Sequence, residues 1–164
     1  MRPQVLLWPD DFMLSLAFAV AAAAAAAAPP PSLNATAAPG GSIWTQVIGL
    51  PTSKPVSHPT TWPLMLVSTT RFLRAVSSED GQVKWIFDTG CFRDVMTEPV
   101  FSNDGKTVYV GCGTKLFSID MGKGHENWVY TTANKIEEPP MVSPLGSSIY
   151  VAASDGIMYA ISGP

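Results

Sequence analysis

The side chains that most often carry out catalysis are sparse in this 164-residue sequence and match no catalytic spacing. The two histidines, His58 and His125, have no neighbour at the spacing of a metal site or a catalytic triad, so both are interpreted as surface residues. Asp120 falls in an expected turn, where a carboxylate caps backbone N–H groups before it acts as a base. Gly122-Lys123 lacks the rest of a phosphate-binding loop. We therefore predict no catalytic, cofactor-binding or metal-binding residue.

The two cysteines, Cys91 and Cys112, lie 21 residues apart, which fits no metal-binding motif. In an oxidising compartment they could form a disulfide, and otherwise they would be two buried thiols. Asn34-Ala35-Thr36 is an N-glycosylation sequon, which matters only if this segment enters the secretory lumen. These residues do not decide whether the protein lies in an oxidising or a reducing compartment.

The distribution of charge argues against a nucleic-acid partner. The net charge is −3, the isoelectric point is near 5.2, and the lysines and arginines are scattered singly. Binding to a phosphate backbone needs a clustered basic field, which this sequence lacks.

The first 39 residues differ from the rest and are expected to be a helical or disordered Ala/Pro-rich segment. Residues 12–28 form an apolar, alanine-rich run, followed by three prolines. This resembles a secretory signal peptide, although Asp10 and Asp11 precede it instead of a basic region. A signal anchor, a transit peptide or a low-complexity run without a targeting role are the alternatives. A signal peptide or a signal anchor predicts a lumenal or extracytoplasmic protein, with membrane contact only through an anchor.

The remaining residues, 40–164, contain a repeat of about 42 residues. Gly-x-x-x-Trp recurs at Gly40–Trp44, Gly81–Trp85 and Gly124–Trp128, at spacings of 41 and 43 residues. Glu98 to Ser102 is echoed by Pro139 to Ser143, one period later. Repeats of 40–50 residues are typical of β-propeller blades.

Within each repeat, short runs of alternating apolar and polar residues separated by turns predict four antiparallel strands. In the complete unit we expect strands at 100–102, 106–111, 114–120 and 126–131, with a tight turn at Asn103–Gly105. The next unit repeats the first three, at 141–143, 148–153 and 157–162. Residues 43–48 are expected to be a lone outer strand, and 51–63 a connector.

These repeats resemble the pyrroloquinoline-quinone (PQQ)-like repeat, whose docking motif is A-x-D-x-x-T-G-K-x-x-W. Residues 75–85 match it at Ala75, Gly81 and Trp85, and residues 118–128 begin at Ser118 and match at Asp120, Gly124 and Trp128. Gly40 and Trp44 are a partial copy, and another begins at Ala160. A glycine with positive φ followed by a large flat ring would hold neighbouring blades together. The resemblance implies an all-β, incomplete propeller of about three blades.

The family divides into quinone-dependent dehydrogenases and non-catalytic propellers. The dehydrogenases need a vicinal disulfide and a calcium site, and the sequence has no adjacent cysteines. We therefore expect a non-enzymatic interaction or scaffold module without a cofactor. One alternative is part of a PQQ-dependent dehydrogenase, which dye reduction with added quinone and calcium would test. Another is a regulatory propeller appended to an acyl-activating enzyme, which a cytosolic location would favour and glycosylation at Asn34 would exclude.

Too few blades for closure are expected, because propellers close with roughly four to eight blades. The sequence therefore predicts a part of a longer protein, or a chain completed by a protein partner or by self-association. By analogy of fold, the rim loops at 103–105 and 145–147 are candidates for binding.

Overall fold

The computed structural model describes residues 39, 41–59 and 62–163, and this part of the chain contains eleven β-strands. The strands are β1 (Val56–Ser57), β2 (Leu64–Ser68), β3 (Phe72–Ser77), β4 (Val83–Asp88), β5 (Val100–Phe101), β6 (Thr107–Cys112), β7 (Lys115–Asp120), β8 (Glu126–Thr131), β9 (Met141–Val142), β10 (Ser148–Ala152) and β11 (Met158–Ser162). Among these residues no helix could cross a membrane.

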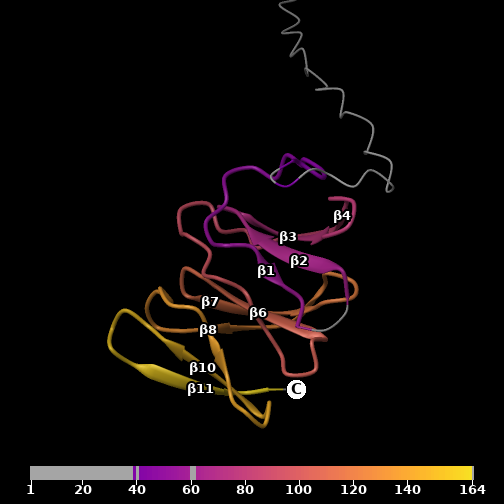
Figure 1. Ribbon diagram of the computed structural model, residues 1–164. Coiled ribbons are helices and arrows are strands. Elements are labelled where there is room, and N and C mark those ends of the chain that lie inside the picture. Colours follow the sequence, from indigo (N-terminus) through magenta and orange to yellow (C-terminus); the bar gives the residue numbers. More distant parts are fainter. Residues whose placement is uncertain (1–38, 40, 60–61, 164) are drawn as a thin grey trace, which may run out of the picture.

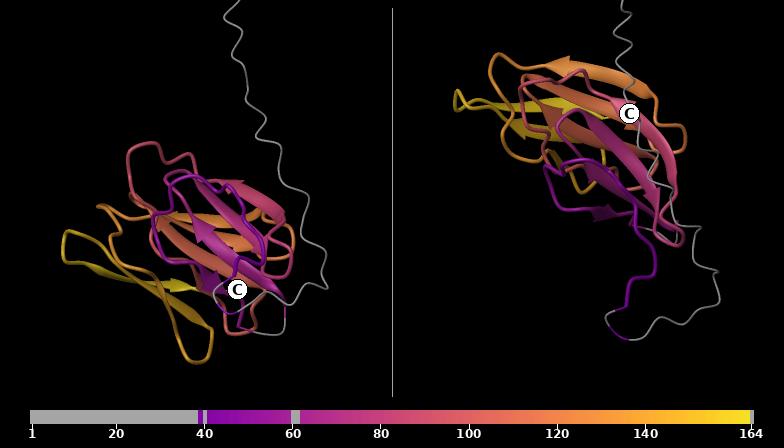
Figure 2. Two further views of the ribbon diagram at one scale, coloured as in Figure 1. Left: turned by 45° about the horizontal axis from the view of Figure 1, so that its top comes forward. Right: turned by 90° about the horizontal axis from the view of Figure 1, so that it is seen from above.

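The strands form three antiparallel sheets, which we call blades 1, 2 and 3. Blade 1 has the order β1-β2-β3-β4, blade 2 has β5-β6-β7-β8, and blade 3 has β9-β10-β11. Sequence neighbours pair throughout, so each blade is a meander, and the blades lie side by side in sequence order (Figure 1). Blade 2 lies between the other two, since it shares one buried cluster with blade 1 and a second with blade 3. Figure 2 shows the three sheets from two further directions. The predicted all-β architecture of propeller blades is confirmed.

Two sequence-based assignments near the start of the repeat domain are wrong. The expected connector at 51–63 contains β1, in which Val56 pairs with Leu66. This strand has only two residues, so it is too short for an alternating pattern to reveal it. The expected lone strand at 43–48 is irregular, because no described strand offers it a ladder of hydrogen bonds.

The core lies between the blades, since alternate residues of each inner strand point to opposite faces. Between blades 1 and 2, Leu66 and Leu73 pack with Val108 and Val110. Between blades 2 and 3, buried residues of both sheets form a second cluster: Tyr109, Leu116, Ile136, Ile149 and Val151. Burying each such aliphatic side chain contributes about 1.5–3 kcal/mol, so contacts between blades are a main source of stability.

The segment 1–38 and Gly40 lie outside the described residues. The expected signal or anchor segment, the sequon at Asn34 and the first docking glycine fall there. The domain boundary after residue 39 remains a prediction.

Candidate functional site

The docking motif of blade 2 receives a tryptophan from blade 1. Trp85 donates its indole N–H to the carbonyl of Met121 at 2.8 Å. Gly124 has a φ of +68°, and a Cβ at this position would lie 2.6 Å from the Trp85 ring. The turn is capped by Asp120, whose carboxylate accepts the backbone N–H of Lys123 at 2.8 Å. Gly124 thus combines a left-handed conformation with the closest approach to the ring.

Trp44 makes the same kind of contact with blade 1. Its indole N–H donates to the carbonyl of Ser78 at 3.1 Å, and a Cβ at Gly81 would lie 2.5 Å from its ring. Gly81 has a φ of +71°. Although residues 43–48 form no strand, Trp44 therefore occupies the position against blade 1 that Trp85 occupies against blade 2.

The third tryptophan, Trp128, lies beside an open groove. It pairs with Ser118 across β7 and β8, as Trp85 pairs with Ala75 across β3 and β4. Its ring packs at 5.9 Å from that of Tyr109, and the groove of about 680 Å³ runs from Trp128 to Gly163. Ser118 lines this groove, and within the described residues its buried hydroxyl has no hydrogen-bond partner.

The two cysteines are joined in a disulfide with a Cα–Cα distance of 6.4 Å. Cys91 lies in the loop between blades 1 and 2, whereas Cys112 is the buried last residue of β6. The bond therefore fastens the loop that connects the two blades to the body of blade 2.

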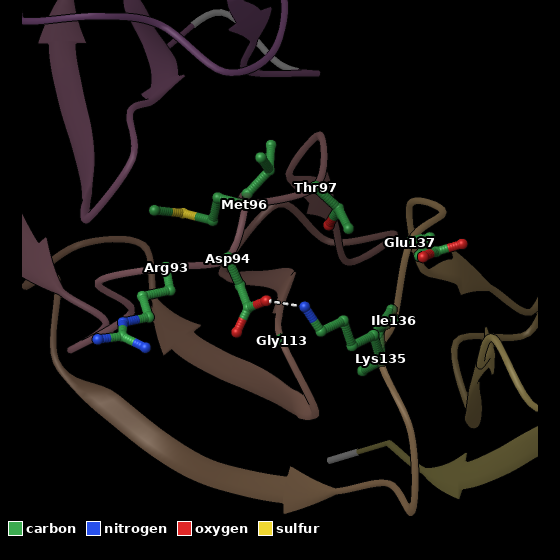
Figure 3. A pocket seen from close by; sticks show the side chains of 9 residues that line it. Arg93, Asp94, Met96, Thr97, Gly113, Lys135, Ile136 and Glu137 are labelled. Carbon is green, nitrogen blue, oxygen red and sulfur yellow. Dashed lines mark hydrogen bonds and ion pairs between the residues drawn. The ribbon is translucent and has the colours of Figure 1, made fainter.

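An ion pair joins this loop to the next connection. Lys135, between blades 2 and 3, lies 2.5 Å from Asp94 across a pocket of about 270 Å³ (Figure 3). The hydrogen bond to Asp94 raises the pKa of Lys135. Asp94 also lies over Gly113, where a Cβ would come within 2.7 Å of the carboxylate. The two inter-blade loops are thus tied to each other at one end of the blades.

Two large apolar side chains project from the same loop. Phe92 is 74% exposed and Val95 is 65% exposed, although the loop is fastened at Cys91 and Asp94. The guanidinium of Arg71 lies 4.4 Å from the centre of the Phe92 ring. Arg71 also pairs with Asp88 through two hydrogen bonds, which raises the pKa of Arg71 and lowers that of Asp88.

We call the surface formed by Arg71, Phe92, Asp94, Val95 and Lys135 the connector face. The connector face was not identified from the sequence, because this surface contains no motif. Its main feature is an exposed aromatic side chain next to a cysteine in an irregular loop. Phe92 next to Cys91 was the available signal.

The rim loops predicted to bind are partly used for packing between blades. Asn103 donates its amide to the carbonyls of Ser143 and Pro144, at 3.1 and 2.9 Å, so the turn of blade 2 contacts that of blade 3. Leu145, on the contacting turn of blade 3, is 92% exposed. The loop at 103–105 is therefore mainly a contact between blades.

The interpretation of His58 as a surface residue is wrong. Its side chain is buried, and Nε2 donates to the carbonyl of Gly105 at 2.9 Å. The rings of Trp62 and Phe101 lie 5.4 and 5.1 Å away. The proline-rich sequence around His58 suggested that it is exposed. Because His58 directly follows β1, its side chain instead packs against the Gly105 turn of blade 2. His125 is exposed. Over the described ranges, no three or more acidic, histidine or cysteine residues are grouped as in a metal site.

Comparison with known proteins agrees on the fold. No family model matches the sequence, and no curated protein matches it. Among solved structures, BamB from Moraxella catarrhalis superposes with a TM-score of 0.56 at 18% identity, covering 72% of this chain. The chain spans about a third of that protein, 34% of its length. The described part therefore has the fold of β-propeller blades.

Proposed function

We propose that this chain is a non-catalytic protein-interaction module, and that its connector face binds a protein partner. The observation that carries the proposal is Phe92, a large aromatic side chain that is 74% exposed on a loop held by a disulfide. Aromatic residues are enriched among those that dominate binding energy at protein interfaces. A loop that is already ordered loses little conformational entropy when it binds.

The surroundings of Phe92 fit this role. Val95, three residues further along the loop, is a second exposed apolar side chain, and Arg71 lies over the Phe92 ring while its charge is paired with Asp88. The ion pair of Asp94 and Lys135 borders the apolar residues. An apolar centre with a polar rim is the usual anatomy of an interface. The favoured partner is therefore a protein with an apolar pocket or groove that accepts Phe92.

An extracytoplasmic location is part of the proposal. The disulfide supports it, since such bonds persist mainly in oxidising compartments, and the alanine-rich start of the sequence supports it independently. The fold shared with BamB supports the propeller architecture and carries no role over to this chain.

The test is site-specific photocrosslinking in the cells that make the protein. A photoreactive phenylalanine analogue replaces Phe92 in one variant and Leu145 in a second. Leu145 is the matched control, because it is exposed and apolar but lies on a turn away from the connector face. We expect a discrete crosslinked protein from position 92 and none of that mass from position 145. Equal crosslinking at both positions, or none at 92, would refute the proposed surface.

A further inference from the structure

The face of blade 3 that points away from blade 2 resembles a core face without its cover. The repeat places Leu73 of blade 1, Leu116 of blade 2 and Met158 of blade 3 at equivalent positions. Leu73 and Leu116 are both 0% exposed, because the next blade packs over each of them, whereas Met158 is 71% exposed. A large apolar residue at a position that is otherwise fully buried indicates a surface that receives another sheet.

The outer edge of blade 3 is also open. β3 pairs with β4 and β7 pairs with β8, but among the described strands β11 pairs only with β10. An unpaired edge presents backbone N–H and C=O groups to any strand of suitable register. Figure 1 shows β11 at the margin of the stack. Within the described residues, blade 3 therefore has three strands, whereas blades 1 and 2 have four.

The same chain carries a segment that matches this missing strand. Residues 43–48 contain Trp44, which docks on Gly81 of blade 1 as Trp85 docks on Gly124 of blade 2. In the repeat, such a tryptophan belongs to the fourth strand of the preceding blade. Residues 43–48 thus occupy the place of a fourth strand next to blade 1, and no described strand pairs with them.

We propose that residues 43–48 of a second copy pair with β11 and complete blade 3. The contact joins blade 3 of one copy to blade 1 of the next, so it is head-to-tail and closes only when the rotation returns to the start. Each copy supplies two complete blades, three strands of another and one fourth strand. The described blades of two copies therefore add up to a ring of about six blades, within the range of known propellers.

The register of the new pair follows from blade 2. There, Leu116 lies opposite Tyr130, and Ser118 lies opposite Trp128. By the same register, Met158 lies opposite Gln46 of the second copy, and Ala160 lies opposite its Trp44. Both Met158 and Gln46 are exposed, so they can be replaced without disturbing the core.

Two measurements on the full chain test this contact. Light scattering coupled to size-exclusion chromatography should give twice the chain mass of 17.5 kDa. A variant with Gln46→Cys is then mixed with a second variant carrying Met158→Cys under mild oxidation. We expect a covalent dimer on a non-reducing gel from the mixture, and at least fivefold less from Gln46→Cys mixed with Asp155→Cys, which is out of register.

A charge at the contact supplies the control. Met158→Asp should convert the dimer to monomer. Leu145→Asp, at an exposed apolar residue on another surface, should leave it dimeric. A wild-type monomer, an aggregate, or a dimer that crosslinks equally in and out of register would overturn the proposal. Because the connector face is a separate surface, either proposal can fail without the other.

Discussion

The position of Gly124 imposes two constraints that only glycine satisfies together. Its backbone has a φ of +68°, and its missing side chain leaves room for the Trp85 ring. Gly156 has a similar φ of +81° but nothing within 4 Å of a Cβ position. Substituting alanine at each position therefore separates the free-energy cost of backbone strain from the cost of displacing a ring.

We expect Gly124→Ala to lower the free energy of unfolding by roughly 2–4 kcal/mol, from backbone strain together with overpacking. Gly156→Ala should cost only about 1 kcal/mol, because backbone strain acts there alone. Urea unfolding followed by tryptophan fluorescence measures both. Equal losses in the two variants would show that the Trp85 contact contributes nothing.

Asp104 gives the stability of blade 2 a dependence on pH. A hydrogen bond from the Ser102 hydroxyl at 2.6 Å is the main cause that lowers the pKa of Asp104, and the backbone N–H of Lys106 adds to it. A carboxyl with a lowered pKa in the folded state stabilises the fold above its unfolded pKa of about 3.9. This contribution is lost as the pH falls from there through the folded pKa.

Asp104→Asn should therefore reduce the loss of stability between pH 6 and pH 3, since an amide does not titrate. Urea midpoints at the two pH values measure the difference. Glu126→Gln, in which an exposed carboxylate of β8 is replaced, serves as the matched control. An unchanged pH dependence in Asp104→Asn would contradict the assigned role of the turn.

At the scale of elements, the disulfide decides how the loop between blades 1 and 2 is held. It closes a loop of 21 residues. A crosslink over a loop of this length stabilises a protein by about 3 kcal/mol, mostly by restricting the unfolded chain.

We expect Cys91→Ser to lower the free energy of unfolding by about 3 kcal/mol. The wild-type protein treated with a reducing agent should show the same urea midpoint as the variant. If reduction leaves the wild-type midpoint unchanged, the disulfide does not restrict the loop.

The sequence predicted the strands of blades 2 and 3 closely because their repeats include both turns and alternation. The sequence-based prediction failed where contact with a neighbouring strand or blade determines the structure. β1 exists because β2 lies beside it, residues 43–48 stay irregular because no described strand lies beside them, and His58 is buried because blade 2 covers it. The docking motif residues could be found from spacing. The connector face could not, since the packing of two loops created it.

At the scale of the whole molecule, equivalent positions in successive blades have different environments. Leu116 is covered by blade 3, whereas no described residue of the same chain covers Met158. With the proposed pairing of two copies, the stability of blade 3 should depend on the concentration of the protein, as in any assembly that buries a face between copies.

Leu116→Ala should cost about 2–5 kcal/mol at any protein concentration, as expected for a buried leucine. Met158→Ala should cost less than about 0.5 kcal/mol in dilute protein, where it behaves as a surface residue. Its cost should rise with concentration as copies associate. Thermal unfolding over a hundredfold range of concentration measures this, and a constant small cost would argue against assembly through blade 3.

The turns between first and second strands give the blades a direction. His58 of blade 1 reaches the turn of blade 2, and Asn103 of blade 2 reaches that of blade 3. Within the described residues, blade 2 thus makes a turn contact with each of its neighbours, whereas blade 3 makes one with blade 2 alone. Under a pulling force applied to the two ends, the blades would not share the load equally. Blade 3 would peel away first, and blades 1 and 2, linked by the disulfide loop, would yield later.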